Sequence, residues 1–524
     1  MSLAIRSVVI VGGGTAGWIS AGVISASLIK RYGKDNPKRP TVTLVESAHT
    51  PPIGVGEGTL PTMRATLASM GISESDFIRE THASFKQGST FRQWRKNTQD
   101  DIYQHPFTLP SDFSRTNLAE YWLSENWRRD YGEFAYFATP QAKVCEQMLA
   151  PKQSTTPEYA AVCNYGYHLD AAKFAVFLRQ HCVEKLSVHH VIDEVLGIKK
   201  HDNGHIKAIC THANHEIEGQ LFIDCTGAKS LLLGEHCGVE FKSKKDVLFV
   251  DSAIATQVNY TESLAPVESN TLSTAQSAGW IWDIGLPTRR GMGYAYASQF
   301  TTKENAQSTI EQYIQNDRYA KASGEYRHIS FTPGHRARFW QGNCVAIGLS
   351  AGFVEPLEAS SIALVELSAK MIAEQFPSHT AALVQLERRF NRAFLYRWQR
   401  IIDFLKLHYA LSQREDSAFW LKNRDQATWP ESLKEMLDGW RHQAPWHYDF
   451  EQVEIFPSAS YQYILCGMGY SHNLQSPRQS GWVNRDFDHL LHSNKKTEAS
   501  YLAALPTTRE LLEKLKRQDF PLRG

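Results

Sequence analysis

A glycine-rich turn directly after a buried strand pattern constrains the fold of this chain more than any other feature. Residues 7–11 form an apolar β-pattern that runs into the sequence GGGTAG and then into helix-forming residues. In such a turn the first glycine allows a tight bend, the second lets the backbone approach a pyrophosphate, and the third lets the helix pack closely. The amino-terminal end of the helix dipole then faces the phosphates. The expected dinucleotide contacts are Gly12, Gly14, Thr15, Ala16 and Gly17.

A second strand pattern, 41–45, ends in Glu46, where a carboxylate holds ribose hydroxyls in folds of this kind. The acid argues against a ribose that carries a 2′-phosphate. The polar insert 30–39 makes the spacing longer than usual. Strand, glycine turn, helix and terminal acid together still predict dinucleotide binding.

Two later strand-to-turn junctions favour FAD over NAD. The pattern 221–224 ends in Asp224 and a Cys-Thr-Gly turn, and residues 344–348 form a third buried strand that ends at Gly348, just before Ser350. Such junctions return the chain to the nucleotide in two-domain flavoproteins, whereas NAD enzymes rarely need them. We expect an α/β fold of the FAD-binding Rossmann type, with Asp224, Gly348 and Ser350 among the cofactor contacts.

The composition favours small-molecule partners. The 56 Lys and Arg residues balance 55 Asp and Glu residues, which gives no electrostatic case for nucleic acid or an anionic membrane. No stretch approaches the length that spans a bilayer, and a cytoplasmic location is expected. The eight scattered cysteines predict buried free thiols. The histidine pairs 189/190 and 212/215 lack further ligands at metal-site spacing, so no metal site is expected.

The pattern along the chain predicts three units. From residue 383 onward it becomes helical and rich in aromatic residues that suit core packing, which predicts a helical subdomain added to the FAD-binding fold. The expected division is a discontinuous FAD-binding module of residues 1–100, 160–245 and 335–385, substrate-covering and sheet segments of residues 101–159 and 246–334, and a helical C-terminal subdomain of residues 386–524.

The segment GWIWDI at 279–284 fits the W-x-W-x-I portion of the signature of flavin-dependent halogenases, the family that includes the tryptophan halogenases. Three further stretches agree in order. GVGEGTLP at 54–61 resembles the flavin-contacting loop of that family, ASFK at 83–86 resembles the stretch that carries its active-site lysine, and GLSAGFVEPLE at 348–358 is similar to the segment of its catalytic glutamate. The resemblance covers residues 8 to about 370.

Two departures concern the substrate. The tryptophan-specific members follow the glutamate with Ser-Thr-Gly, whereas this chain has Ala-Ser-Ser at 359–361, and Gly285 replaces the proline after W-x-W-x-I. These differences do not change the resemblance to flavin-dependent halogenases, but they leave the identity of the substrate open.

The resemblance implies an enzyme that uses reduced FAD, oxygen and chloride or bromide to make hypohalous acid, which then halogenates an electron-rich aromatic of the indole or tryptophan type. It implies that Lys86 receives the hypohalous acid, by hydrogen bonding or as a haloamine, and that Glu358 polarises the acid or accepts the proton from the ring. Gly56, Glu57 and Gly58 are the implied flavin contacts.

The remaining implied roles surround this pair. The backbone amides of Ser360 and Ser361 are candidates for the halide site, because uncovered N–H groups at a turn bind anions. Trp280 and Trp282 form an apolar wall beside the flavin, and His105 and Phe107 line the substrate pocket. A separate flavin reductase supplies reduced FAD, and a homodimer is expected.

Other readings remain open. A lone lysine is usually a solvated charge, and a tryptophan pair is usually core. A flavin-dependent aromatic monooxygenase shares the fold, and Trp280 and Trp282 are the discriminating residues. A non-catalytic flavin-binding protein would bind flavin without forming product. Residues 348–352 also satisfy G-x-S-x-G, but no downstream Asp then His supports a serine hydrolase.

Overall fold

The predicted first strand lies inside a six-stranded sheet of order β20-β21-β12-β1-β2-β8. All its pairings are parallel except that of β20 with β21. The computed structural model describes residues 4–49, 56–125, 127–452, 454–474 and 487–522. The strands are β1 (Ser7–Val11), β2 (Thr41–Glu46), β8 (His189–Ile192), β12 (Leu221–Asp224), β20 (Trp340–Gln341) and β21 (Cys344–Ala346).

Three of the expected strands are confirmed, and the fourth is shorter than expected. β1, β2 and β12 match the predicted patterns, whereas β21 ends at Ala346. It stops there because Gly348 has a φ of 77° and opens a 3₁₀ turn, which a strand cannot accommodate.

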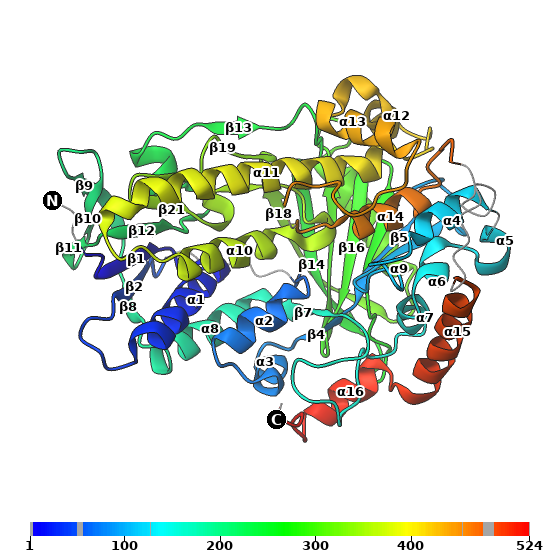
Figure 1. Ribbon diagram of the computed structural model, residues 1–524, viewed down its shortest axis with the longest axis horizontal. Coiled ribbons are helices and arrows are strands. Elements are labelled where there is room, and N and C mark those ends of the chain that lie inside the picture. The colour runs from blue at the N-terminus through cyan, green and yellow to red at the C-terminus, as the bar shows by residue number, and fades with distance from the viewer. Residues whose placement is uncertain (1–3, 50–55, 126, 453, 475–486, 523–524) are drawn as a thin grey trace.

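Helix α1 (Thr15–Tyr32) begins directly after the glycine turn and packs against α8 (Ala171–Glu184) and α10 (Ser360–Glu374) (Figure 1). Its buried residues include Trp18, Ile19 and Ile24, which pack into the main hydrophobic core together with β1. The turn is thereby held between a buried strand and a buried helix.

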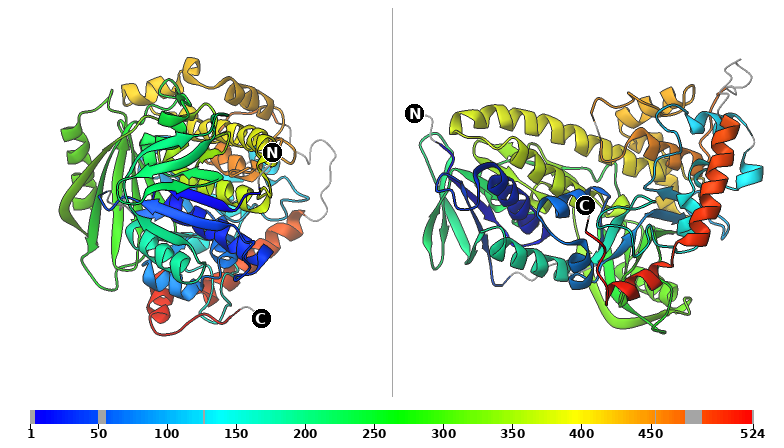
Figure 2. Two further views of the ribbon diagram at one scale, coloured as in Figure 1. Left: turned by 90° about the vertical axis from the view of Figure 1, so that its left-hand side faces the viewer. Right: turned by 60° about the horizontal axis from the view of Figure 1, so that its bottom comes forward.

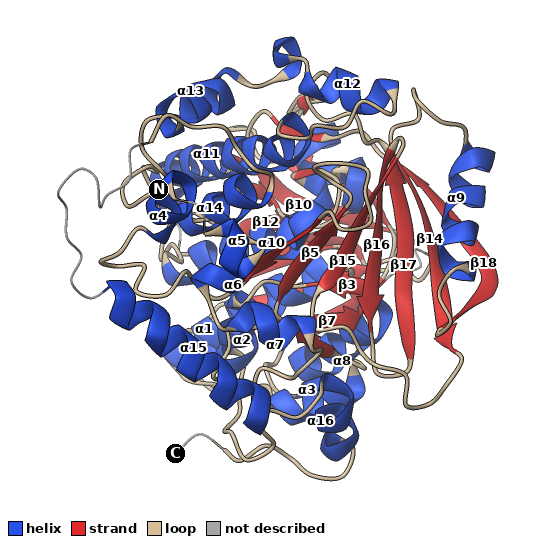
Figure 3. Cartoon of the chain, turned by 90° about the vertical axis from the view of Figure 1, so that its right-hand side faces the viewer, coloured by secondary structure: helices blue, strands red, loops and turns tan. Residues whose placement is uncertain are grey.

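A second, seven-stranded sheet has the order β18-β14-β17-β16-β15-β5-β6, and only β5 and β15 pair in parallel (Figure 3). Helix α9 (Lys303–Gln315) packs on β14, β17 and β18, and Ile310 and Ile314 bury against Ile281 of β16. The strands are β5 (Gly88–Arg92), β6 (Ile102–Pro106), β14 (Ser252–Tyr260), β15 (Thr271–Gln276), β16 (Gly279–Gly285), β17 (Arg289–Tyr296) and β18 (Ala320–Ser330).

The remaining strands of the described structure form three sheets of three strands each. One has the order β3-β7-β4, and it brings Gly58 and Ser84 to either side of His168. The members are β3 (Gly56–Gly58), β7 (Gly166–Asp170) and β4 (Ser84–Lys86); β9 (Val195–Lys200), β10 (Ile206–Thr211) and β11 (His215–Glu218); and β13 (Phe241–Ser243), β19 (Gly334–Arg336) and β22 (Gly352–Phe353).

The C-terminal region is helical, as expected, and it packs on both sheets. Its first helix, α11 (Leu383–Ala410), has 28 residues and extends along the molecule above α10 (Figure 1). Helix α15 packs against α7 and α16 against β4, so the end of the chain lies beside elements from its first third (Figure 2). The other helices are α2 (Thr62–Ser69), α3 (Glu74–Glu80), α4 (Leu118–Ser124), α5 (Arg128–Tyr131), α6 (Phe134–Ala138), α7 (Gln141–Glu146), α12 (Ala418–Arg424), α13 (Glu431–Trp440), α14 (Ser458–Gly467), α15 (Phe487–Ala504) and α16 (Thr508–Leu515).

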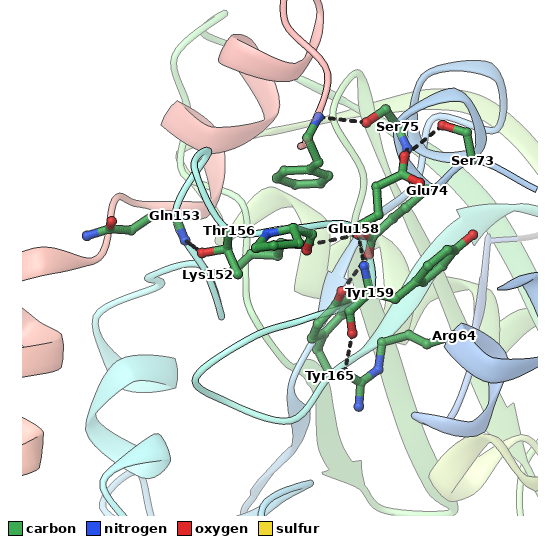
Figure 4. A network of polar contacts seen from close by, with 12 residues as sticks. Arg64, Ser73, Glu74, Ser75, Lys152, Gln153, Thr156, Glu158, Tyr159 and Tyr165 are labelled. Carbon is green, nitrogen blue, oxygen red and sulfur yellow. Dashed lines mark hydrogen bonds and ion pairs between the residues drawn. The ribbon is translucent and has the colours of Figure 1, made fainter. Parts of the chain in front are cut away.

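A buried polar network fixes the C-terminal segment to α3 (Figure 4). Nζ of Lys152 lies 2.9 Å from Oε2 of Glu74, and both side chains are fully buried. Glu74 also accepts hydrogen bonds from the hydroxyls of Tyr165 and Tyr167. The ring centroid of Phe520 lies 3.8 Å from Nζ of Lys152. This single ion pair therefore joins three distant segments of the chain.

None of the helices in the described ranges is long and apolar enough to cross a membrane. Within the same ranges, no group of three or more His, Cys, Asp or Glu residues is arranged to hold a metal ion. All eight cysteines are free thiols.

Candidate active site

A cavity of about 790 Å³ extends from the glycine turn to the side chains of Lys86 and Glu358. Both sheets contribute to its walls. Most of the residues expected from the sequence line it: Gly12, Gly14, Thr15, Ala16, Glu46, Gly56, Glu57, Gly58, Lys86, Trp280, Trp282, Gly348, Glu358 and Ser361. Residues 54 and 55 of the expected flavin-contacting loop lie outside the described residues.

The glycine turn fits a diphosphate. A Cβ on Gly14 would meet no atom within 4 Å, so this side of the turn is open, whereas a Cβ on Gly12 would lie 2.2 Å from the carbonyl oxygen of Cys225. The first turn of α1 contains no acidic residue, and no side chain caps it. Uncapped amides at a helix N-terminus favour an anion at this position.

The carboxylate of Glu46 lies at the carboxyl end of β2, where a ribose would be held. Its Oε1 is 2.7 Å from Nε2 of His190 on the neighbouring strand β8. Glu57 lines the same cavity, and burial raises its pKa to about 7. The turn, the acid at the strand end and the size of the cavity together suit FAD.

Asp224, Ser350 and Gly17 do not line the cavity but lie behind its wall. The carboxylate of Asp224 accepts hydrogen bonds from the backbone N–H groups of Leu232 and Leu233, at 2.9 and 2.8 Å. The hydroxyl of Ser350 donates to the backbone carbonyl of Asp224. These side chains hold the turns that shape the cavity, and their polar atoms are already occupied by the protein.

Lys86 is buried at the far end of the cavity, on β4. Its side chain is 1% exposed, and Nζ lies 5.4 Å from the ring centroid of Phe107. Within the described parts of the chain, Nζ has no hydrogen-bond or ion-pair partner. Burial lowers the pKa of Lys86 to about 8, and the charge of Glu358 opposes that shift. An amine with so low a pKa has a substantial neutral fraction near neutral pH and is available to an electrophile.

Glu358 is held by strained backbone and by three polar neighbours. Glu358 and Ala359 have φ values of 63° and 56°, in the left-handed region that costs non-glycine residues of order 1–3 kcal/mol each. Oε2 accepts a hydrogen bond from the hydroxyl of Ser89 at 2.8 Å, and Oε1 lies 2.6 Å from Nδ1 of His105. Nε2 of His408 is 3.6 Å from the same Oε1.

These neighbours decide the protonation state of the carboxyl group. Burial alone raises the pKa of Glu358, but the charge and hydrogen bond of His105, together with the nearby ring of His408, outweigh burial and hold the pKa well below its usual range. A buried glutamate that stays ionised is suited to accept a proton or to polarise a bound acid.

The two expected aromatic walls differ in their relation to the cavity. Trp280 and Trp282 line it from one face of β16, with ring centroids 6.2 Å apart. The ring of Trp282 lies over Gly293, where a Cβ would be only 2.0 Å from it. His105 and Phe107 do not line this cavity but lie beyond the Lys86 and Glu358 pair, where Nε2 of His105 is 3.0 Å from the hydroxyl of Ser460.

The two expected halide residues also differ. The side chain of Ser361 lines the cavity, whereas Ser360 is buried and its hydroxyl has no hydrogen-bond partner in the described structure. Both belong to the first turn of α10, which no side chain caps. An uncapped helix start beside an unpartnered hydroxyl is compatible with a bound anion.

The sequence did not reveal Ser89, His408 or Glu355 as site residues. Ser89 and His408 touch Glu358, and Glu355 accepts the indole N–H of Trp280 at 2.6 Å. Glu355 lies three residues before Glu358, and this proximity in the sequence could have indicated that Glu355 also belongs to the site. Nothing in the local sequence around residue 408 indicates its contact, because α11 folds back from another part of the chain.

A Rossmann-type module with an open glycine turn, and a cavity lined by that turn, two tryptophans, a lysine and a glutamate, define a flavoprotein enzyme. The family model described as tryptophan halogenase matches residues 7–481. The crystal structure of a tryptophan halogenase from Shewanella frigidimarina NCIMB 400 is similar with a TM-score of 0.93 and 44% identity, over 99% of each chain.

Curated relatives agree along the whole length. The chain is 31% identical to tryptophan 6-halogenase ThaL of Streptomyces albogriseolus, over 98% of each protein. It is 30% identical to tryptophan 7-halogenase RebH of Lentzea aerocolonigenes, over 98% of this chain and 99% of that protein. The chain belongs to the tryptophan halogenase family of flavin-dependent halogenases. The expected fold class and enzyme class are thereby confirmed.

Proposed function

We propose that this protein uses reduced FAD, oxygen and a halide to make hypohalous acid, and that it halogenates an electron-rich aromatic substrate of the indole or tryptophan type. The observation that carries the proposal is that one cavity is lined both by the glycine turn and by Lys86 and an ionised Glu358; among the described residues, Lys86 has no hydrogen-bond or ion-pair partner. Trp280 and Trp282 form part of the wall of the same cavity.

Residues at the first end would hold the cofactor. The amides of the glycine turn bind the pyrophosphate, Glu46 binds the ribose, and β3 together with Trp280 and Trp282 lies along the path of the ring system. When bound, reduced FAD supplies with oxygen the oxidising power that converts the halide to hypohalous acid. The turn at Ser360 and Ser361 is our candidate for the halide, because its amides are uncapped.

Residues at the second end would direct the halogen. The neutral amine of Lys86 holds the hypohalous acid by a hydrogen bond, or takes its halogen as the O–halogen bond breaks and the hydroxyl leaves as water with a proton from the amine. Either way the electrophile is fixed next to one ring carbon. Glu358 accepts the proton that leaves the ring when it regains aromaticity. His105 and Phe107 lie next to this pair and would contact the substrate ring.

The test combines purified protein with a flavin reductase, NADH, oxygen, chloride or bromide, and a panel of indoles that includes tryptophan. Halogenated product that depends on halide is expected. Hydroxylated product without halide would identify an aromatic monooxygenase, and flavin reoxidation without either product would identify a non-catalytic flavin-binding protein.

Lys86→Ala is the sharpest variant for this assay. It should abolish halogenated product while flavin reoxidation continues at the original rate. Lys303→Ala, on the exposed face of α9, makes the same change away from the cavity and should keep full activity. Retained product in Lys86→Ala would remove this residue from the mechanism.

Two partner assignments complete the proposal. A separate flavin reductase supplies the reduced cofactor, and the working form is a homodimer. Sedimentation of the purified protein tests the second point, since a monomer at micromolar concentration would contradict it.

A further inference from the structure

His408 is a buried residue of α11 whose protonation pattern is defined by one contact. Its side chain is fully buried, and Nδ1 lies 2.8 Å from the backbone carbonyl oxygen of Phe404, one turn earlier. A carbonyl oxygen only accepts, so Nδ1 carries the hydrogen of the neutral ring. Nε2 is therefore the nitrogen that gains or loses a proton.

This nitrogen lies close to the carboxylate of Glu358. Nε2 has no hydrogen-bond partner in the described structure, and it lies 3.6 Å from Oε1 of Glu358. The ring centroids of Phe91 and Phe404 are each 5.0 Å from that of His408. A neutral imidazole nitrogen and an ionised carboxylate are both acceptors, so their contact becomes attractive only when a proton joins them.

We propose that His408 is a positioning residue that takes over the proton which Glu358 removes from the halogenated ring. The inference rests on the proposed function. In the first step the ring C–H bond breaks, its electron pair returns to the ring, and the proton binds the carboxylate of Glu358. In the second step the proton moves from Oε1 to Nε2 of His408, which leaves a carboxylate beside an imidazolium. No electrons are exchanged in either step, and the proton leaves to water after product release.

The other groups around Glu358 are less suited to this role. His105 on β6 already has partners at both ring nitrogens, Glu358 and Ser460. The charge of Glu358 acts on Lys86 of β4 and Tyr103 of β6, and neither residue is hydrogen-bonded to Glu358 in the described structure. Ser89 on β5 donates to the opposite oxygen, Oε2. Among the histidines of the described structure that lie next to Glu358, His408 is the one with an unoccupied ring nitrogen.

The first experiment compares His408→Phe with the unchanged enzyme. Phenylalanine keeps the ring packing against Phe91 and Phe404 but cannot take up a proton. With saturating indole, product formation should fall about tenfold, because the proton taken from the ring then stays on Glu358. The KM for indole and the rate of flavin reoxidation should stay the same.

A kinetic isotope effect distinguishes slow proton removal from a structural defect, because a structural defect does not change it in this direction. With ring-deuterated indole, His408→Phe should show a larger kinetic isotope effect than the unchanged enzyme, because loss of the ring proton becomes slow. His201→Phe, at an exposed turn, is the matched control and should leave both readings unchanged. An unaltered rate of product formation and an unaltered isotope effect in His408→Phe would overturn the proposal.

A second measurement uses the unchanged protein and needs no substrate. Nitrogen-15 NMR of the histidine rings should show His408 with its hydrogen on Nδ1. Hydrogen on Nε2 in the neutral ring would refute the role of His408 even if halogenation occurs. Absence of halogenated product in the unchanged enzyme would instead refute the proposed function.

Discussion

The indole nitrogen of Trp280 donates a 2.6 Å hydrogen bond to Oε2 of Glu355, and the hydroxyl of Tyr409 donates to the same oxygen at 2.6 Å. The carboxylate is 2% exposed, and burial raises its pKa to about 7 against the opposing effect of these two donors. Glu355 thus fixes the orientation of one of the two tryptophans that line the cavity.

We predict that Glu355→Leu uncouples flavin oxidation from halogenation. The variant leaves the buried indole N–H without an acceptor, at a cost of about 1–3 kcal/mol that favours other positions of the ring. Product per NADH consumed should fall severalfold, while Glu355→Gln, which keeps an acceptor oxygen, should retain most of it. Equal coupling in both variants would show that Trp280 is held by packing alone.

A second prediction concerns stability. Burial lowers the pKa of Lys86 from 10.5 to about 8, so the folded protein without flavin carries a penalty on the order of 3 kcal/mol. The unfolded chain binds more protons between these two pKa values, so the penalty is complete below pH 8 and disappears as the pH rises through 10.5. Lys86→Met should therefore raise the urea midpoint at pH 7 and have little effect at pH 10.5. A lower midpoint at pH 7 would contradict this.

The glycine turn offers a matched pair of substitutions. Gly14→Ala places its Cβ in the open cavity, so the apo protein should lose no more than about 1 kcal/mol, while affinity for FAD falls at least tenfold. Gly12→Ala forces a Cβ against the carbonyl of Cys225 at a φ of 112°, and should destabilise the apo protein by at least about 2 kcal/mol. Flavin fluorescence titration and thermal unfolding separate the two effects.

The buried ion pair of Lys152 and Glu74 should contribute far more to the free energy of unfolding than an exposed ion pair does. Glu74→Gln leaves the ammonium group without its carboxylate and should cost about 3–5 kcal/mol in the free energy of unfolding. Glu146→Gln breaks the exposed pair with Lys143 and should cost about 1 kcal/mol at most. Urea unfolding at one pH and salt concentration makes the comparison. Similar losses in both variants would contradict the role of burial.

Local patterns predicted the parts of the site that belong to one element. The run before the glycine turn and the acid that ends β2 follow from the strand pattern, whereas the resemblance to the halogenase family pointed to Trp280 and Trp282; Glu46 and both tryptophans line the cavity. These patterns could not predict which groups the side chain of Asp224 contacts. The strand pattern shows where β12 ends, but not that the amides of Leu232 and Leu233 occupy its carboxylate.

The neighbours of Glu358 were beyond local reasoning for a different reason. Its contacts with His105 and Ser89 join residues 253 and 269 positions apart. Only the packing of β5, β6 and α11 around the loop before α10 brings these groups together. The composition of each segment gives no sign of that packing.

Helix α11 has a practical consequence for chimeric enzymes. Near its start, Phe390, Phe394 and Trp398 line the dinucleotide cavity, and near its end His408 and Tyr409 brace Glu358 and Glu355. A chimera that exchanges the C-terminal region from residue 386 onward would cut into this helix. The residues at positions 408 and 409, which contact the two carboxylates, would then come from the other protein. A junction placed after Leu411 would transplant the remaining helices and keep the native scaffold of both carboxylates.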